Sequence, residues 1–241
     1  MLNPDLNWTE LKRSFLIDGR IRIDNIFQPD DAKEIQNCCL TQIPYDLIYH
    51  SNTGNHLKTM AEMAAMAPET QQLLQSELHQ LANKGVGFLY GGYRMQKEPG
   101  KTSYLESGTA PTQARNLFNF LNSSEMLSFI SFISGKTGLV EADGQYTRFG
   151  PGHYLTRHSD NIASENRQLA YVIGFTPKWH PDWGGLLQFY EKNGSPRDAW
   201  SPEFNSLSLF DVEHIHSVTY VAPYASEPRL SLTGWFKNKG S

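Results

Sequence analysis

The stretch Arg157-His158-Ser159-Asp160 decides the interpretation of this sequence, because it ends a Tyr- and Gly-rich run that is typical of a β-strand. On a strand alternate side chains share one face, so His158 and Asp160 project together while Ser159 points away. One imidazole beside one carboxylate supplies two of the three ligands of a 2-His-1-carboxylate iron site. The pattern therefore predicts a metal site that needs one further histidine from a distant segment.

The candidate for the missing ligand is His216, in the segment Ile215–Val218. His214 competes with it, because residues two apart on a strand lie on the same face. The residues that follow favour His216: a Ser-Val pair comes next, then a turn, and then the segment that begins at Arg229.

A second His-x-Asp match, His180-Pro181-Asp182, has to be weighed against the first. This spacing arises readily by chance in a chain with 8 histidines, so the surrounding residues decide. Proline cannot donate to a strand ladder, and the neighbouring Pro, Trp and Gly residues are typical of a turn. We therefore expect His180 to lie in a loop.

Arg229-Leu230-Ser231 forms another alternating pair thirteen residues after His216. On a strand, Arg229 and Ser231 share one face, and a guanidinium fork beside a hydroxyl suits a carboxylate. This segment predicts a binding site for a carboxylate near the metal.

Composition and charge narrow the class of protein. The 241 residues carry 21 basic and 25 acidic side chains, a formal charge of −4, which disfavours direct binding to nucleic acid. No apolar run approaches the ~20 residues of a membrane helix, and the first residues lack the pattern of a signal peptide. The adjacent Cys38 and Cys39 cannot join distant segments, so a reducing, cytoplasmic location is expected.

Helical periodicity dominates the first half of the chain and strand-like alternation the second. The clearest helix is 68–83, whose Leu stripe we expect in the core, and capping residues predict another over 126–133. About seven strands follow residue 139, which predicts an α+β chain whose C-terminal half is an antiparallel sandwich or jelly roll. One domain, 1–241, is expected, with mostly helical support and substrate-side elements in 1–138 and the jelly-roll core in 139–237. The strands are expected at 20–26, 86–96, 140–149, 154–160, 167–176, 186–190, 206–212, 214–221 and 229–236.

Several motifs in this order resemble the prolyl-hydroxylase group of 2-oxoglutarate/Fe(II) dioxygenases, and most closely its bacterial proline-hydroxylase-like proteins and the eukaryotic ribosomal-protein prolyl hydroxylases. The resemblance is strong over residues 140–237 and looser before them. The motifs are Phe149–Gly152, His158–Asp160, Asp182–Leu187, Pro202–Phe210, His216–Val218 and Arg229–Trp235.

The resemblance implies a double-stranded β-helix in which the positions of His158, Asp160 and His216 bind Fe(II). It implies that 2-oxoglutarate chelates the iron and meets Arg229, with Ser231 nearby, that O2 is the oxidant, and that ascorbate is a compatible reductant. Two positions depart from the family, which commonly has tyrosine at Phe149 and near Gly174. We then expect a larger pocket or one with different hydrogen bonds. The missing hydroxyl would be supplied by one of three tyrosines: Tyr146, Tyr154 or Tyr171.

The leading functional hypothesis is hydroxylation of a prolyl residue in a protein, such as a ribosomal protein or translation factor, with release of succinate and CO2. The alternative is a hydroxylase of a free amino acid or small metabolite, and a non-enzymatic binding module is disfavoured by the complete triad. The loop 97–111, with Tyr90, Tyr93 and Arg94, is expected to distinguish the first two hypotheses. An open groove formed by these residues would indicate a polypeptide substrate, and a sealed pocket would indicate a small molecule. The oligomeric state does not follow from the sequence.

Overall fold

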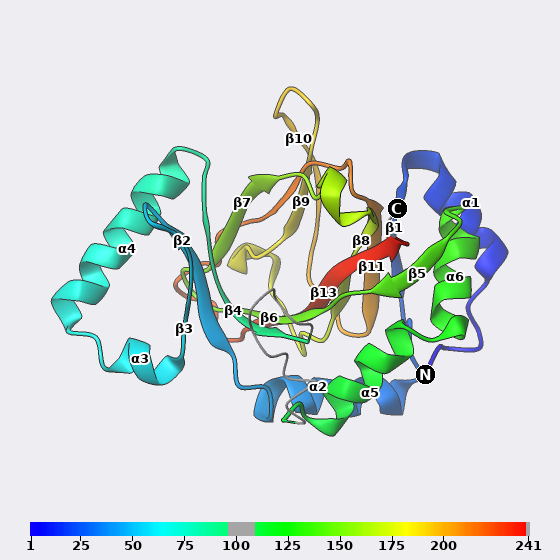
Figure 1. Cartoon of the computed structure of the whole chain (residues 1–241), viewed down its shortest axis with the longest axis horizontal. Helices are drawn as coiled ribbons and strands as arrows, with labels where there is room; N and C mark the ends of the chain where they lie inside the picture. Colours follow the sequence, from blue (N-terminus) through cyan, green and yellow to red (C-terminus); the bar gives the residue numbers. More distant parts are fainter. Residues whose placement is uncertain (96–108, 240–241) are drawn as a thin grey trace.

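The computed structural model describes residues 1–95 and 109–239 and shows one curled antiparallel sheet with helices on its outer side (Figure 1). Most of the loop predicted at 97–111 lies outside the described residues. The helices are α1 (Trp8–Asp18), α2 (Pro29–Thr41), α3 (Met60–Ala64), α4 (Pro68–Asn83), α5 (Thr112–Leu121) and α6 (Ser124–Ser134), with short 3-10 turns η1 (Ala163–Glu165) and η2 (Pro181–Trp183). The strands are β1 (Arg20–Asp24), β2 (Asp46–Ser51), β3 (Gly54–Lys58), β4 (Phe88–Arg94), β5 (Leu139–Ala142), β6 (Gln145–Phe149), β7 (Tyr154–His158), β8 (Arg167–Gly174), β9 (Leu187–Tyr190), β10 (Pro196–Trp200), β11 (Ser206–Asp211), β12 (His216–Val218) and β13 (Arg229–Asn238).

The strands follow the order β1-β11-β8-β13-β6-β4-β7-β12-β9-β10, with β2, β3 and β5 paired off this path. The sheet curls so far that its two end strands approach each other. Arg20 on β1 donates to Asp198 on β10 across a distance of 2.6 Å. The curl confirms the predicted jelly-roll, or double-stranded β-helix, architecture, in which closing the sheet leaves few exposed strand edges.

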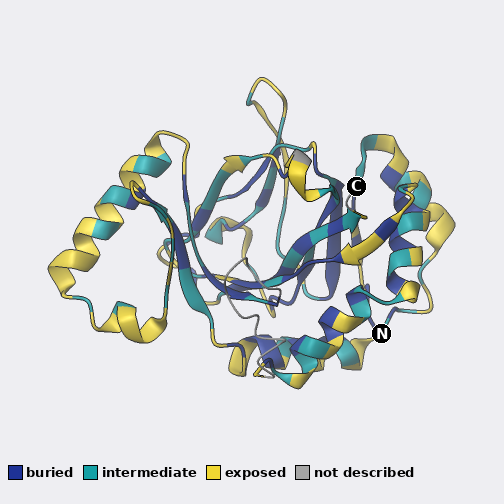
Figure 2. Cartoon of the chain, in the orientation of Figure 1, coloured by how far each residue is buried: buried dark blue, intermediate teal, exposed yellow. Residues whose placement is uncertain are grey.

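The two faces of the curled sheet have different environments. Outward side chains of β6, β8 and β13, among them Tyr146, Ile173 and Leu232, pack with α2, α5 and α6 in the main hydrophobic cluster. Inward side chains of the same strands include Thr147 and Ser231, which are buried although they are polar. Figure 2 shows burial concentrated on the strands and on the helix surfaces that face them. The inner face of these strands therefore carries buried polar groups, as expected of a site rather than of a core.

Local capping accounts for the predicted helices. α6 begins where the Ser123 side chain accepts a hydrogen bond from the Met126 amide, and it ends at Gly135 in the left-handed conformation (φ 72°).

The helix α4 has the predicted bounds, but its Leu stripe does not form core. Within α4 only Leu78 is buried, and Leu73 is 72% exposed. The reason is position, since α4 lies at the periphery and packs against β2 and β4 (Figure 1).

The N-terminal half contributes more strand than the sequence predicted. Besides β1 and β4, the hairpin β2–β3 joins the sheet through the pairing of β2 with β4. Its strand β3 alternates between half-buried and exposed residues, whereas β2 shows no clear alternation of burial. Main-chain hydrogen bonds join β2 to β4 and β3 to β2, and such pairing between distant segments does not show in the local side-chain pattern. Across the described residues, no helix combines the length and apolar character needed to cross a membrane.

Candidate metal and co-substrate site

His158, Asp160 and His216 meet inside the curled sheet. His158 ends β7 and pairs directly with His216 at the start of β12, so two strands distant in sequence place their imidazoles 4.2 Å apart between ring centroids. Asp160 Oδ1 lies 3.6 Å from His158 Nε2, and its Oδ2 lies 3.4 Å from His216 Nε2. One ligand atom from each residue falls within 4.8 Å of the others, which fits the donor set of an iron site.

Backbone carbonyls orient both imidazoles toward this point. His158 Nδ1 donates to the Thr156 carbonyl at 2.9 Å, and His216 Nδ1 donates to the His214 carbonyl at 3.0 Å. Each bond holds the proton on Nδ1, so each Nε2 presents its lone pair to a metal. Burial, together with the neighbouring His158, lowers the pKa of His216 to about 4, which keeps it neutral at physiological pH.

The competing histidines lie elsewhere. His214 precedes β12, and its Nε2 is 2.9 Å from the Asp18 carbonyl oxygen, outside the ligand cluster. His180 stands just before η2 with 61% of its side chain exposed, which confirms the expected loop.

Arg229 presents an unsatisfied guanidinium on the inner face of β13. It is buried, its Nη1 donates to the Gly185 carbonyl at 2.9 Å, and its Nε finds no partner among the described residues. Loss of hydration lowers the pKa of Arg229 to about 10, so the group stays charged at neutral pH. A buried cation with a free donor, and with no counter-ion in the part of the chain that the structure describes, has the chemistry expected of a carboxylate-binding residue.

A hydroxyl pair continues the same inner face. Ser231 lies opposite Thr147 on β6, and their hydroxyl oxygens are 2.9 Å apart. Thr147 was missed in the sequence because its importance comes from the register of β6 with β13, which no local pattern reveals. The structure thus brings a second hydroxyl beside Ser231.

Tyr146, predicted to contact the co-substrate, requires a correction. It neighbours Thr147 on β6 and so points to the outer face, where its hydroxyl donates to the Ala114 carbonyl at 3.2 Å. The two other candidates also use their hydroxyls on main-chain carbonyls, Tyr154 on Leu78 and Tyr171 on Asp143. None of the three supplies the missing family hydroxyl.

The two departures from the family have different consequences. Phe149 stacks on Tyr90, with ring centroids 5.2 Å apart, and lies 5.3 Å from the Arg229 guanidinium, so it forms an apolar wall for that cation. Gly174 leaves no extra room, because a side chain there would collide with the Glu203 carbonyl oxygen. Of the two expected outcomes, a larger pocket does not occur at position 174, because backbone already fills that space.

Arg167 and Trp235 stand beside the metal ligands and were not predicted. The Arg167 guanidinium lies 3.4 Å from the Trp235 ring centroid, and its Nη1 is 4.0 Å from Asp160 Oδ1. The Trp235 Nε1 donor is buried without a partner among the described residues. Strand alternation from Arg229 could have placed Trp235 on this face, whereas the approach of Arg167 depends on the pairing of β8 with β13.

Comparison with known proteins agrees with this geometry. The family model described as the 2OG-Fe(II) oxygenase superfamily matches residues 144–237, which confirms the predicted resemblance over this region. Fe(II), 2-oxoglutarate and O2 are the cofactor and co-substrates that this family implies, and the donor set above fits iron.

Among individual proteins, the prolyl 3-hydroxylase OGFOD1 of Xenopus laevis is 32% identical over 96 residues, which are 37% of this chain and 18% of that protein. The chain thus matches less than a fifth of that relative's length. A Pseudomonas putida prolyl-4-hydroxylase structure has a TM-score of 0.60 at 16% identity, covering 97% of this chain and all of that one. A Trichoplax adhaerens prolyl hydroxylase in complex with a hypoxia inducible factor peptide has a TM-score of 0.59 at 17% identity, covering 98% and 94%. These structures share the fold.

Proposed function

We propose that this chain is an Fe(II)- and 2-oxoglutarate-dependent dioxygenase that hydroxylates a prolyl residue of a protein. In that reaction one oxygen atom of O2 enters the substrate C–H bond and the other enters succinate, while 2-oxoglutarate loses CO2. The observation that carries the proposal is the pairing of a complete His-Asp-His donor set with the unsatisfied, buried guanidinium of Arg229 inside one curled sheet.

His158, Asp160 and His216 would hold the iron through two Nε2 atoms and one carboxylate. When bound there, Fe(II) supplies the redox centre at which O2 and the 2-oxo acid react. The protein contributes neutral imidazoles held by the Thr156 and His214 carbonyls, and a carboxylate that balances part of the metal charge.

Arg229 would bind the distal carboxylate of 2-oxoglutarate. Its fixed fork can give a charge-assisted, two-point contact, and the Thr147–Ser231 hydroxyl pair offers further donors on the same inner face. Phe149 and Val221 lie in the apolar cluster near this position, which excludes water around the ion pair and strengthens it.

Two features support a prolyl residue in a polypeptide as the substrate. His158 is half-buried rather than enclosed, and the Arg167–Trp235 pair beside Asp160 presents a half-buried aromatic ring. A pyrrolidine ring can pack against the half-buried indole beside the guanidinium that lies over it. The relatives named prolyl hydroxylases support the same substrate class.

The earlier resemblance to ribosomal-protein prolyl hydroxylases makes a ribosomal protein or translation factor the leading target. This choice agrees with a cytoplasmic protein, in which the buried Cys38 and Cys39 remain free thiols.

The test is turnover of 2-oxoglutarate by the Fe(II)-loaded protein with prolyl peptides tiling ribosomal proteins and translation factors, and in parallel with free proline and other amino acids. Mass spectrometry should find one added oxygen atom on a peptidyl proline, with succinate formed in equal amount. Faster hydroxylation of a free amino acid than of any peptide would replace the proposal with the small-metabolite alternative. Absence of succinate under all conditions would reject the enzyme class.

A further inference from the structure

A groove of about 550 Å³ runs on the outer side of the strands that carry the two histidine ligands. It lies between the C-terminal half of α4 and the strands β7, β9 and β12, away from the interior that holds the metal ligands. Nothing in the proposed reaction uses it. The side chains on which the argument rests are His79, Tyr154, Arg157, Tyr190, Ser217 and Tyr220.

Aromatic rings form much of this surface, which we call the tyrosine groove. Tyr154 and Tyr220 stack with ring centroids 6.2 Å apart, and His79 meets Tyr220 edge-on at the same separation. Tyr220 is 44% exposed, so its ring is open to a partner. Grooves lined with such rings bind proline-containing segments in the extended polyproline conformation, because the rigid chain loses little entropy on binding.

The residues that line the tyrosine groove include a cation, Arg157, and no anion. Arg157 is exposed beside the Tyr190 ring, 5.8 Å from its centroid, and makes no ion pair with any residue that the structure describes. No carboxylate is among the residues that line the groove. In a chain with a net charge of −4, this unpaired cation is complementary to an acidic side chain.

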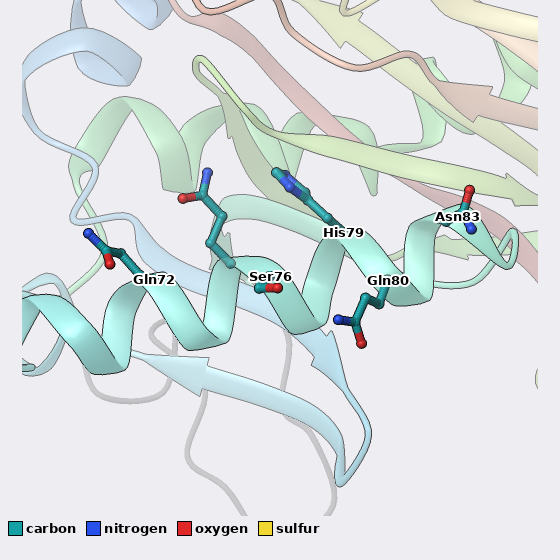
Figure 3. A pocket seen from close by; sticks show the side chains of 6 residues that line it. Gln72, Ser76, His79, Gln80 and Asn83 are labelled. Carbon is teal, nitrogen blue, oxygen red and sulfur yellow. The ribbon is translucent and has the colours of Figure 1, made fainter.

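The adjoining face of α4 adds polar groups suited to a peptide backbone. A second depression of about 560 Å³ follows one face of this helix, and His79 and Asn83 line both hollows. Figure 3 shows Gln72, Ser76, His79, Gln80 and Asn83 spaced along the helix. Side-chain amides both donate and accept, so they can pair with main-chain N–H and C=O groups without adding charge.

The tyrosine groove reaches the strand positions that carry the ligands. Arg157 directly precedes His158, and Ser217 directly follows His216, so two residues that line the groove adjoin the two histidines of the ligand cluster. A polypeptide that places one residue at the metal could therefore cross the rim of the sheet and continue along the groove.

From these observations we infer that the tyrosine groove binds an acidic, proline-containing segment of the protein substrate, outside the residue that is hydroxylated. This inference rests on the proposed function, because it assigns the groove to the same polypeptide. The rings hold proline, Arg157 pairs with a carboxylate, and the amides of α4 pair with the backbone.

Binding can be tested without turnover, by fluorescence anisotropy with two labelled peptides, one of five Pro-Pro-Glu repeats and one of five Pro-Pro-Lys repeats. The wild-type protein should bind the acidic peptide about tenfold more tightly, and Arg157→Glu should reverse the preference. Tyr220→Ala should weaken both peptides about fivefold. Matched controls are Lys33→Glu on α2 and Tyr224→Ala, which are both exposed and do not line the groove, and neither should change binding. Equal binding of the two peptides, or no effect of Arg157→Glu, would overturn the inference.

Catalysis provides the second arm, using the peptide hydroxylated best in the tiling experiment. Arg157→Glu should raise KM for that peptide about tenfold at constant kcat, with unchanged Fe(II) affinity and unchanged 2-oxoglutarate turnover in the absence of peptide. An unchanged KM would reject the groove as a substrate site while the proposed function stands. If instead the wild-type protein binds the repeat peptide but hydroxylates no polypeptide, the prolyl-hydroxylase proposal and the groove's substrate role both fall.

Discussion

Arg20 and Asp198 join the two ends of the strand order, with the Arg20 Nη1 2.6 Å from the Asp198 carboxylate. The same guanidinium lies 4.5 Å from the Phe189 ring centroid, and Phe189 in turn lies 6.4 Å from His216. One arginine near the N-terminus therefore closes the curled sheet and supports the aromatic wall behind a metal-ligand candidate. The Arg20 side chain is only 9% exposed, whereas that of Asp198 is 43% exposed, so the guanidinium is shielded from water and the carboxylate is not.

Replacing Arg20 should loosen both the closure and the metal site. We expect Arg20→Ala to lower the free energy of unfolding by about 1 to 2 kcal/mol, because it removes the buried guanidinium from the Phe189 ring and from Asp198, while Asp18 keeps its ion pair with Arg197. Affinity for Fe(II) or Co(II) should fall about tenfold, as for other supports of a metal ligand. Arg22→Ala, on the same strand but more exposed, is the matched control and should change neither quantity in urea unfolding and calorimetric titration.

The histidine assignment can be tested by comparing two neighbours. His216→Ala should weaken metal binding more than about 100-fold, because it removes one of three ligands from a preformed site. His214→Ala should leave a usable site, since the hydrogen bond that orients His216 comes from the His214 carbonyl and the substitution keeps that carbonyl. Co(II) absorption spectra would report the binding, and equal losses in the two variants would remove His216 from the ligand set.

Arg229 should govern the affinity for 2-oxoglutarate and not for the metal. A charge-assisted hydrogen bond contributes roughly 1.5 to 3 kcal/mol, so Arg229→Ala should raise the dissociation constant of 2-oxoglutarate by one to two orders of magnitude. Arg229→Lys should restore only part of the affinity, because an ammonium cannot form the two-point contact. Titration calorimetry with Mn(II)-loaded protein separates the two ligands, and an unchanged 2-oxoglutarate affinity in Arg229→Ala would contradict this role.

Thr147 and Tyr146 form a matched pair on β6 that distinguishes its two faces. Thr147→Val should weaken 2-oxoglutarate binding several-fold, since it removes the hydroxyl that orients Ser231. Tyr146→Phe should leave the affinity unchanged and cost about 1 kcal/mol of stability, because it deletes one buried hydrogen bond to Ala114. A stronger effect of Tyr146→Phe on 2-oxoglutarate binding would reverse the assignment of the two faces.

The metal-free protein should lose stability as the pH falls from about 6.5 to about 4. The pKa of His216 is about 4 in the folded chain and near 6.5 when unfolded, so the unfolded state binds more protons in this window. The stability contributed by neutral His216 is fully present above pH 6.5 and is lost progressively below it, by about 3 kcal/mol in the limit. Urea unfolding at pH 7 and pH 4.5 should show a smaller loss for His216→Asn than for the wild-type chain, and equal losses would contradict the lowered pKa.

Local residue patterns determined much of this protein. The His158–Asp160 alternation, the later His216 and Arg229, and the capping residues of α6 act over a few positions, so the sequence alone was sufficient to predict the metal cluster, the buried cation and the helix. The proline in His180-Pro181-Asp182 was likewise sufficient to assign that histidine to a loop. These predictions depend on side-chain periodicity and on backbone chemistry, and both are set by residues that are close together in the sequence.

Only the tertiary structure decided which side chains meet across strands. Tyr146 and Thr147 are neighbours on β6 and both are buried, so burial does not alternate along this part of the strand. The register of β6 with β13 decides which of the two side chains faces the interior of the sheet. The same holds for Arg167 above Trp235, for the Glu203 carbonyl beside Gly174, and for Arg20 behind Phe189. Each of these contacts depends on how the sheet curls and closes, and that is set by the packing of the whole chain.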